Sequence, residues 1–356
     1  MGTGTGRPRP FSGRLSGSVG RRDVLKIGVA FAALPLLNAC GSDAGAAGEG
    51  GRAGWRSGTI SPTIPDGFTL MCDKKGFLRD AGLDVEFTTA NGAELVRAAV
   101  GSRLDVILLA PGTGFAAYET GADLKLVGVP WNKVRDFIFA KKEIKDPSDL
   151  VGKRIAIQAP NTSSAILVNA VLDKYGIDPG QVSLVQSGGD PERMAALLSG
   201  QVDAALGGVE NLPIIEKDAN FTTLVTLADI VPDVLGAGWF ATARTIEERP
   251  DDLTKVLTAY TKGMRYALDH LDEATALAME RLKSAPSDKE TVAEAIKAHR
   301  DLKIINPDLG WTDRQVEATQ ELNVGIGAQK DVIPAKDVTD TSFVDKVIAE
   351  LKNYAW

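Results

Sequence analysis

Cysteine and histidine are scarce in this chain. Its 356 residues include two cysteines, Cys40 and Cys72, and two histidines, His270 and His299. Both histidines fall within charged helical stretches near the carboxyl end, where we expect them to be solvated. The sequence shows no metal-ligand spacing, no nucleophile elbow and no phosphate loop. We therefore expect a protein without enzyme activity, metal or cofactor.

The amino-terminal region also lacks an apolar run long enough to span a membrane. The apolar stretch over residues 27–37 has eleven residues, whereas a spanning helix needs about 20. It follows the basic pair Arg21 and Arg22 and precedes small residues, which is the order of a secretory signal peptide. The paired arginines match the twin-arginine variety. We predict that residues 1–39 are a signal peptide that is cleaved.

The predicted signal peptide ends in the sequence LNACG, which resembles the bacterial lipobox, in which the cysteine is lipidated. A chance cysteine after a hydrophobic run is the alternative. A lipid on Cys40 would anchor the protein to the extracytoplasmic face of a bacterial cell membrane. It would also exclude an internal disulfide, because Cys72 would then be a single thiol. We expect Cys72 to be a buried small hydrophobe rather than a nucleophile.

Positive charge is in the minority. The formal net charge is -7 and no basic patch offsets it, which argues against a nucleic-acid partner.

Residues 40–54 are nearly all glycine, alanine and serine with a few charges, a composition that cannot bury a core and predicts a flexible tether. The remaining residues, about 300, are enough for two domains.

Strand-like apolar runs alternate with helical ones from residue 68 onward. This alternation predicts an α/β fold with parallel sheets flanked by helices. The expected strands are residues 83–87, 104–109, 124–129, 154–157, 182–185 and 202–206. After residue 244 the pattern becomes helical, at residues 252–283, 288–302, 313–326 and 343–353. We expect these helices to pack behind two lobes and brace them.

The sequence also contains an internal similarity. Residues 94–108 (ELVRAAVGSRLDVIL) resemble residues 192–206 (ERMAALLSGQVDAAL), which lie 98 positions later. In each segment a helix would end at a turn of small residues and lead into a strand. One unit used once in each of two similar lobes explains this pattern. The alternative is that any helix followed by a strand has a similar sequence.

Three short segments, through their order and spacing, resemble the nitrate, taurine and aliphatic sulfonate type of solute-binding protein, which serves ABC importers and is related to proteins for thiamine pyrimidine precursors. They are residues 75–86 (KGFLRDAGLDVE), 149–156 (DLVGKRIA) and 196–205 (ALLSGQVDAA). The resemblance implies a type II periplasmic-binding-protein fold, in which two Rossmann-like lobes enclose a ligand in a central cleft.

The same resemblance implies where the lobes lie. Lobe 1 would comprise residues 55–130 and 236–356, the latter including the carboxyl-terminal helices, and lobe 2 would comprise residues 131–235. Hinges would lie near residues 131–139 and 232–240. The implied partners are a small-molecule ligand and an ABC permease and ATPase, and we expect a monomer. The related pyrimidine synthases need clusters of cysteine and histidine that this chain lacks.

Ligand-binding loops are expected at the carboxyl ends of the strands, where helix amino termini also point. The strongest candidate loop contains Gln158, Asn161, Thr162, Ser163 and Ser164. Free backbone N–H groups at a helix start, with hydroxyls beside them, suit an anionic group. Simple helix capping by Asn161 or Thr162 is the alternative. A second helix start in the other lobe is expected at Gly112 and Thr113.

Other candidates favour a different ligand. Trp131 and Trp239, near the expected hinges, could stack on a flat ring or simply pack. Asp66 and Glu210 favour a ligand with donor groups or positive charge, unless they face solvent or cap helices. The remaining candidate loop residues are Thr63, Asn91 and Gly208. The ligand is therefore either an anion like sulfonate, nitrate or taurine, or a pyrimidine or other heterocyclic vitamin precursor. The role is transport or, alternatively, solute sensing.

Overall fold

A computed structural model describes residues 52–60, 63–160, 162–282 and 288–352. They fall within one unit of the chain, Gly45–Trp356. The predicted signal peptide, its paired arginines and Cys40 lie outside the described residues. The first strand begins at Ala53, inside the range expected for the tether, where Ala53 pairs with Leu83 of the neighbouring strand.

The first of two five-stranded sheets has the order β2-β1-β3-β10-β4. Its strands are β1 (Ala53–Thr59), β2 (Leu83–Thr89), β3 (Val106–Leu109), β4 (Leu124–Trp131) and β10 (Ala237–Thr242). Strand β1 runs parallel to β2 and β3, whereas β10 is antiparallel to both β3 and β4. The strand most distant in sequence therefore lies inside the sheet.

The second sheet has the order β7-β6-β8-β5-β9. Its strands are β5 (Asp136–Lys141), β6 (Arg154–Ile157), β7 (Ser183–Gln186), β8 (Ala204–Gly208) and β9 (Phe221–Thr226). Strand β6 is parallel to β7 and β8, and β5 is antiparallel to β8 and β9. The expected parallel pairs are therefore present, but each sheet also contains antiparallel pairs. Strands β5, β9 and β10 were not predicted, and each makes antiparallel pairs in a mixed sheet.

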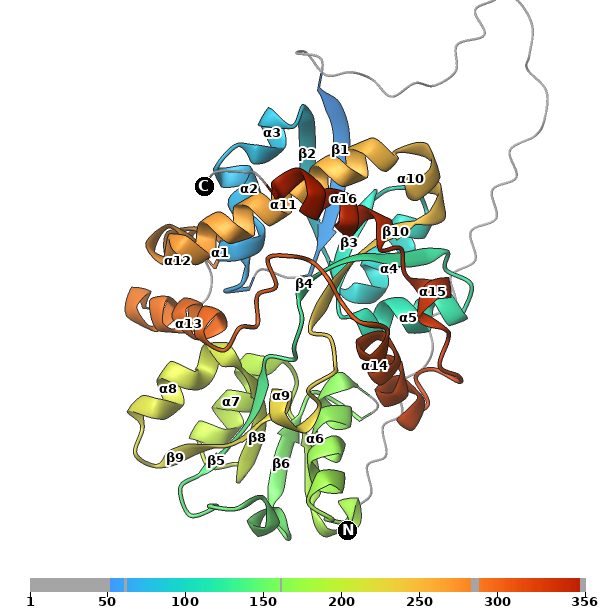
Figure 1. Ribbon diagram of the computed structural model, residues 1–356. Coiled ribbons are helices and arrows are strands. Elements are labelled where there is room, and N and C mark those ends of the chain that lie inside the picture. The colour runs from blue at the N-terminus through green and yellow to red at the C-terminus, as the bar shows by residue number, and fades with distance from the viewer. Residues whose placement is uncertain (1–51, 61–62, 161, 283–287, 353–356) are drawn as a thin grey trace, which may run out of the picture. The chain divides into compact units, whose positions relative to one another are not determined.

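Helices connect the strands of each sheet (Figure 1). Around the first sheet they are α1 (Asp66–Thr69), α2 (Met71–Lys74), α3 (Phe77–Asp80), α4 (Gly92–Val100) and α5 (Pro111–Glu119). Around the second they are α6 (Ser163–Lys174), α7 (Asp190–Leu198), α8 (Leu212–Lys217) and α9 (Leu227–Ile230), with short 3-10 helices η1 (Pro147–Leu150), η2 (Pro179–Gln181) and η3 (Val209–Asn211). This arrangement confirms the predicted α/β class.

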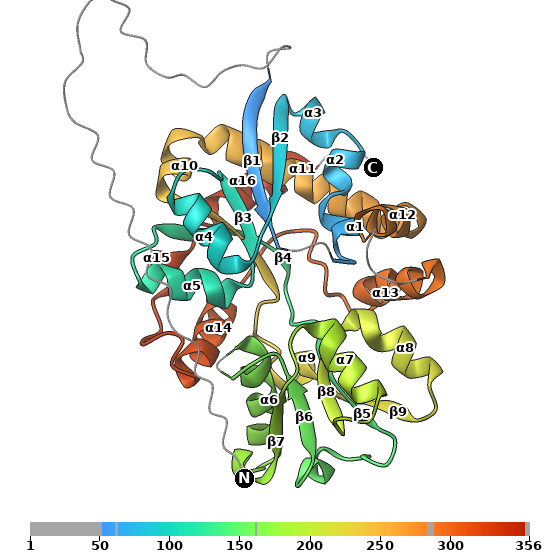
Figure 2. The same ribbon diagram turned by 180° about the vertical axis from the view of Figure 1, so that it is seen from behind.

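The carboxyl-terminal part is helical, as predicted. Its helices are α10 (Ala243–Glu248), α11 (Pro250–Asp269), α12 (Leu271–Arg281), α13 (Lys289–Asp301), α14 (Asp313–Gly325), α15 (Ala335–Val338) and α16 (Ser342–Leu351). The single helix expected over residues 252–283 is two helices, because His270 leaves helical geometry at φ -126° and ψ 62°. Helices α11 and α16 cross one face of the first sheet (Figures 1 and 2).

The internal similarity is visible as a repeated ion pair. In the first sheet, the backbone N–H and the guanidinium of Arg56 both donate to Asp105. In the second sheet, Arg154 makes the same two kinds of bond to Asp203. Each arginine lies 49 positions before its aspartate. The same unit of strand, helix and strand therefore occurs once in each sheet, beyond what a generic helix-to-strand pattern requires.

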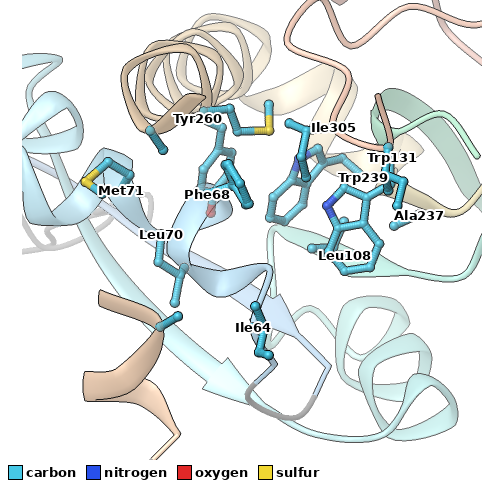
Figure 3. Close-up of a cluster of buried hydrophobic side chains, with 14 of the residues drawn as sticks. Ile64, Phe68, Leu70, Met71, Leu108, Trp131, Ala237, Trp239, Tyr260 and Ile305 are labelled. Carbon is cyan, nitrogen blue, oxygen red and sulfur yellow. The ribbon is translucent and has the colours of Figure 1, made fainter. Parts of the chain in front are cut away.

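A large hydrophobic cluster packs helices such as α11 against the first sheet (Figure 3), and it extends to Phe139 of β5 and Met194 of α7. The rings of Trp239 and Tyr260 stack with their centroids 4.3 Å apart. Cys72 is fully buried nearby, and burial raises the pKa of its thiol well above the ordinary value. A buried thiol held neutral is a poor nucleophile. The prediction that Cys72 is a buried small hydrophobe is therefore confirmed.

The chain passes between the sheets twice. It leaves the first sheet at the end of β4, crosses over residues 132–135 and enters β5. It returns over residues 231–236 into β10. In addition, α13 contacts both α12 and η3, and α14 contacts both α5 and α6. We call the first sheet with its helices and the second sheet with its helices the two halves. Helices α13 and α14 therefore each contact elements of both halves, and these contacts can position a site between them.

Candidate functional site

A cavity of about 450 Å³ lies where the two halves meet. Its walls come from the starts of α5 and α6, from both connecting segments and from one face of α14. The lining residues are Ala110, Pro111, Gly112, Thr113, Ala116, Val134, Arg135, Asp136, Thr162, Ser163, Ile166, Leu167, Val234, Leu235, Gly236, Thr319, Leu322, Asn323, Ile326 and Ala328. Its size is in the range of small-molecule sites.

The start of α5 presents backbone to this cavity. The cap position, Ala110, has no polar side chain, and Pro111 has no N–H. The N–H of Thr113 donates to the carbonyl of Ala110 at 2.9 Å, while Gly112 brings the chain to the cavity without a side chain. A helix amino terminus carries a partial positive charge. This end of α5 therefore favours a negatively charged group in the cavity.

The start of α6 reaches the same cavity from the other half. Thr162 occupies the cap position, but its hydroxyl donates to the carbonyl of Ala159 at 2.7 Å and makes no capping bond. Ser163 is exposed beside it. Two helix starts thus converge on one cavity, and their fields add for an anion bound between them.

Two charged side chains, Arg135 and Asp136, also line the cavity. Arg135 forms an ion pair with Glu210, which lies outside the lining. Burial alone would lower the pKa of Arg135, but the charges of Glu210 and Asp136 raise it above its ordinary value. Burial raises the pKa of Asp136 to about 6, although Arg135 acts in the opposite direction. The cavity therefore offers one permanent cation beside a carboxyl that is neutral only in acid.

Four of the residues proposed from sequence line the cavity: Gly112, Thr113, Thr162 and Ser163. Two others lie directly behind them. The backbone N–H of Gln158 donates to Ser164 Oγ at 2.8 Å, and Ser164 Oγ lies 2.9 Å from Thr162 Oγ1. These two residues hold the loop before α6 in shape. Asn161 lies outside the described residues.

The structure places the other candidates elsewhere. Asn91 caps α4 by accepting the N–H of Glu94. The N–H of Gly208 donates to Asp190, and Glu210 is paired with Arg135. Each of these three polar groups has a partner within the protein.

The remaining four candidates lie on the side of the first sheet. Trp131 and Trp239 are buried in the core cluster (Figure 3). The N–H of Thr63 donates to Asp66, whose carboxylate lies 3.8 Å from Arg281 Nε. Burial raises the pKa of Asp66 to about 6, although Thr63 and Arg281 oppose this. None of the four lines the cavity among the residues that the structure describes.

Sequence reasoning missed part of the lining. Arg135 and Asp136 lie inside a segment predicted only as a hinge, and the α14 residues Thr319, Leu322 and Asn323 were not considered. Asn323 is 211 positions from Gly112, to whose carbonyl its amide donates at 2.7 Å. No local pattern in the sequence indicates a contact over that separation.

The expectation that His299 is solvated is wrong. Its side chain is fully buried, because one face of α13 packs against both α12 and η3. Nδ1 lies 2.8 Å from the carbonyl of Ala295 and so carries the proton, which leaves Nε2 without a partner. Burial lowers the pKa of His299 to about 4, although the charge of Glu210 acts in the opposite direction.

This shift predicts a pH-dependent stability. The unfolded chain protonates His299 near pH 6.5, whereas the folded chain does so only near pH 4. Acidification between these values therefore favours unfolding. Relative to His299→Gln, the wild type should lose about 2 kcal/mol of unfolding free energy between pH 7 and pH 5. Urea unfolding at both pH values measures this, with His270→Gln as control; a constant difference would contradict it.

Comparison with known proteins identifies the family. A family profile described as NMT1/THI5 like matches residues 67–274, more than half of the chain. The chain belongs to the NMT1/THI5-like family. The match covers every strand of the two sheets except β1, and it includes the first long helix after β10, α11.

Named relatives agree with this membership in the NMT1/THI5-like family. A Bacillus subtilis (strain 168) protein named for binding aliphatic sulfonates is 26% identical over 297 residues, which cover 79% of this chain and 85% of the relative. The taurine-binding periplasmic protein of Escherichia coli (strain K12) is 29% identical over 150 residues, covering 41% of this chain and 46% of the relative. These names designate binding proteins and not enzymes, as the sequence predicted.

A solved structure supports the fold of this NMT1/THI5-like chain. The periplasmic aliphatic sulphonate binding protein SsuA from Escherichia coli superposes with a TM-score of 0.66, at 17% identity, over 80% of this chain and 91% of that one. The predicted periplasmic-binding-protein fold is therefore confirmed. No helix in the described part of the chain combines the length and the apolar character needed to cross a membrane.

Proposed function

We propose that this protein captures a small organic anion of the sulfonate type and delivers it to an ABC importer. The observation that carries the proposal is the convergence of two helix starts, one from each half, on a single cavity. Gly112 and Thr113 line it from α5, and Thr162 and Ser163 line it from α6. The names of the relatives, which include sulfonate and taurine binding, point to the same class of ligand.

The rest of the lining suits an apolar body behind the anionic group. Val134, Ile166, Leu167, Leu322 and Ile326 all face the cavity. Burying aliphatic surface contributes about 25 cal/mol per Å². None of the described lining residues is aromatic, so ring stacking, which would favour a pyrimidine or another heterocycle, has no support in this cavity.

We also propose the lobe assignment made from the sequence, with residues 55–130 and 236–356 in one lobe and residues 131–235 in the other. A ligand that touches both lobes at once stabilises the arrangement in which they are close together. Such a ligand shifts the population toward the closed form by its extra contacts there. A closed, ligand-loaded monomer would be the form that a permease recognises.

A thermal-shift screen of the mature chain tests the ligand class. Sulfonates should raise the melting temperature, because a ligand that binds only the folded state stabilises it, by about 2.7 kcal/mol at a hundredfold excess over Kd. Nitrate, simple carboxylates and pyrimidines serve as comparison ligands. Stabilisation by pyrimidines but not by sulfonates would refute the proposal.

We further propose that the mature protein is held at the outer face of the cell membrane by a lipid on Cys40, after export through a twin-arginine signal. The short apolar run and the lipobox-like sequence support this assignment. Cys40→Ser should move the protein from the membrane fraction to the soluble fraction in the bacterial host, since stable attachment depends on the acyl chains. Cys72→Ser is the matched control. Membrane association that survives Cys40→Ser would exclude the lipid anchor.

A further inference from the structure

Three buried side-chain amides form a chain of hydrogen bonds that ends at the cavity. It begins at the backbone of Ile333, whose N–H donates to Gln320 Oε1 at 2.9 Å and whose carbonyl accepts from Gln320 Nε2 at 2.9 Å. Rotating this amide by half a turn would place donor against donor and acceptor against acceptor. The backbone therefore determines the orientation of the Gln320 amide.

Gln320 in turn determines the orientation of Gln329. Gln329 Nε2 donates to Gln320 Oε1 and to the carbonyl of Asp331, both at 2.7 Å. Because two acceptors face this nitrogen, Gln329 Oε1 must point the other way, toward Asn323. Gln320 and Gln329 are 0% and 2% exposed, so water does not offer them an alternative arrangement.

Asn323 is the last member of the chain. Its Nδ2 donates to Gln329 Oε1 at 3.3 Å and to the carbonyl of Gly112 at 2.7 Å. Both partners are acceptors, so Nδ2 and Oδ1 cannot exchange places. Oδ1 accepts no hydrogen bond from the described residues and is not among the buried atoms without a partner. It is therefore an open acceptor on a residue that lines the cavity.

This acceptor lies at the start of α5. A Cβ atom built on Gly112 would be 2.8 Å from Asn323 Oδ1, so the carbonyl oxygen is adjacent to the backbone proposed to attract the anionic group. The carboxyl of Asp136 is a second acceptor in the same lining. An anionic ligand that presents only acceptors and methyl groups would leave Asn323 Oδ1 desolvated and unpaired, which is unfavourable.

We infer that Asn323 is a specificity-determining residue that selects, among sulfonates, those with a hydrogen-bond donor close to the anionic group. Hydroxyalkane and aminoalkane sulfonates have such a donor, and simple alkanesulfonates do not. This inference rests on the proposed function. A site built to accept a hydrogen bond from a ligand discriminates against the analogue that lacks the donor, because the protein group is then left without a partner.

Calorimetric titration with a matched ligand pair tests the inference. The pair is 2-hydroxyethanesulfonate and propanesulfonate, which differ by a hydroxyl in place of a methyl group. The wild type should bind the hydroxylated ligand about tenfold more tightly. Asn323→Leu should bring the ratio of the two affinities to about one or below it. Leu322→Ala, on the same helix and in the same lining, should weaken both ligands and leave the ratio unchanged.

The outcomes separate this inference from the proposed function. Equal affinity of the wild type for both sulfonates, or an unchanged preference in Asn323→Leu, would overturn the role of Asn323 while the sulfonate-binding function stands. Absence of binding by every sulfonate would overturn both. If Asn323→Leu does not fold, Asn323→Ala, which also removes the acceptor, is measured in its place and the same ratio decides.

Discussion

Trp239→Ala is expected to lower the free energy of unfolding by about 3–5 kcal/mol, the usual cost of removing a large buried aromatic side chain. Trp239 is 0% exposed and stacks on Tyr260 with ring centroids 4.3 Å apart and an interplanar angle of 9°. Alanine would leave a cavity between β10 and α11, since the surrounding backbone relaxes only in part. Urea unfolding monitored by circular dichroism measures this loss.

Trp239→Phe is the matched control, because a smaller ring keeps part of the stacking and should cost less. The ligand affinity of both variants, measured on protein that remains folded, should stay close to that of the wild type, since Trp239 does not line the cavity. A small stability loss together with a large affinity loss would instead make Trp239 a ligand-binding residue, which was one reading of its position in the sequence.

Ser163→Asp is expected to weaken sulfonate binding by about 100-fold, through repulsion between two negative charges in a partly shielded site. Ser163 is the first residue of α6, it is exposed, and it lines the cavity. A carboxylate at this position would lie at the amino terminus of α6, where we propose that the anionic group of the ligand binds. The same carboxylate should leave the protein as stable as the wild type or more stable, by about 0.3–1 kcal/mol, because it lies at a helix amino terminus.

The opposite signs of these two effects make the experiment informative. Misfolding would lower both stability and affinity, whereas competition for the helix start lowers affinity alone. Ser163→Asn, with a neutral side chain of similar size to aspartate, should bind sulfonates nearly as well as the wild type. Affinities are measured by calorimetry and stability by thermal unfolding without ligand. Equal sulfonate affinity in Ser163→Asp and Ser163→Asn would show that the anion does not bind at the start of α6.

Much of the α/β framework could be predicted because it depends on local patterns. Strand β6 lies at the predicted residues, Arg154–Ile157, since a short apolar run between turn residues is typical of a buried parallel strand. The antiparallel strands β5 and β10 were read only as hinges. Whether such a segment pairs depends on edges offered by distant strands, and that information is not local.

Some residues of the candidate site could likewise be proposed from the sequence, whereas the roles of others could not. Thr162, Ser163, Gly112 and Thr113 could be proposed from sequence, because helix starts after strands have recognisable residues. The tryptophans could not be assigned, because the same residue type serves in stacking on ligands and in packing a core. Trp131 and Trp239 are in the core. His299, expected at the surface from its charged neighbours, faces inward because its helix has one buried side.

The sequence by itself determined the class of this protein: the alternation of strands and helices, the internal similarity and the family motifs all depend on residues close together in the chain. Only the tertiary structure decided what surrounds the ligand cavity. Arg135 meets Glu210 across 75 positions, and Asn323 meets Gly112 across 211. Contacts over such separations depend on how whole helices and strands pack together. The sequence around each residue therefore does not indicate which distant residue it contacts.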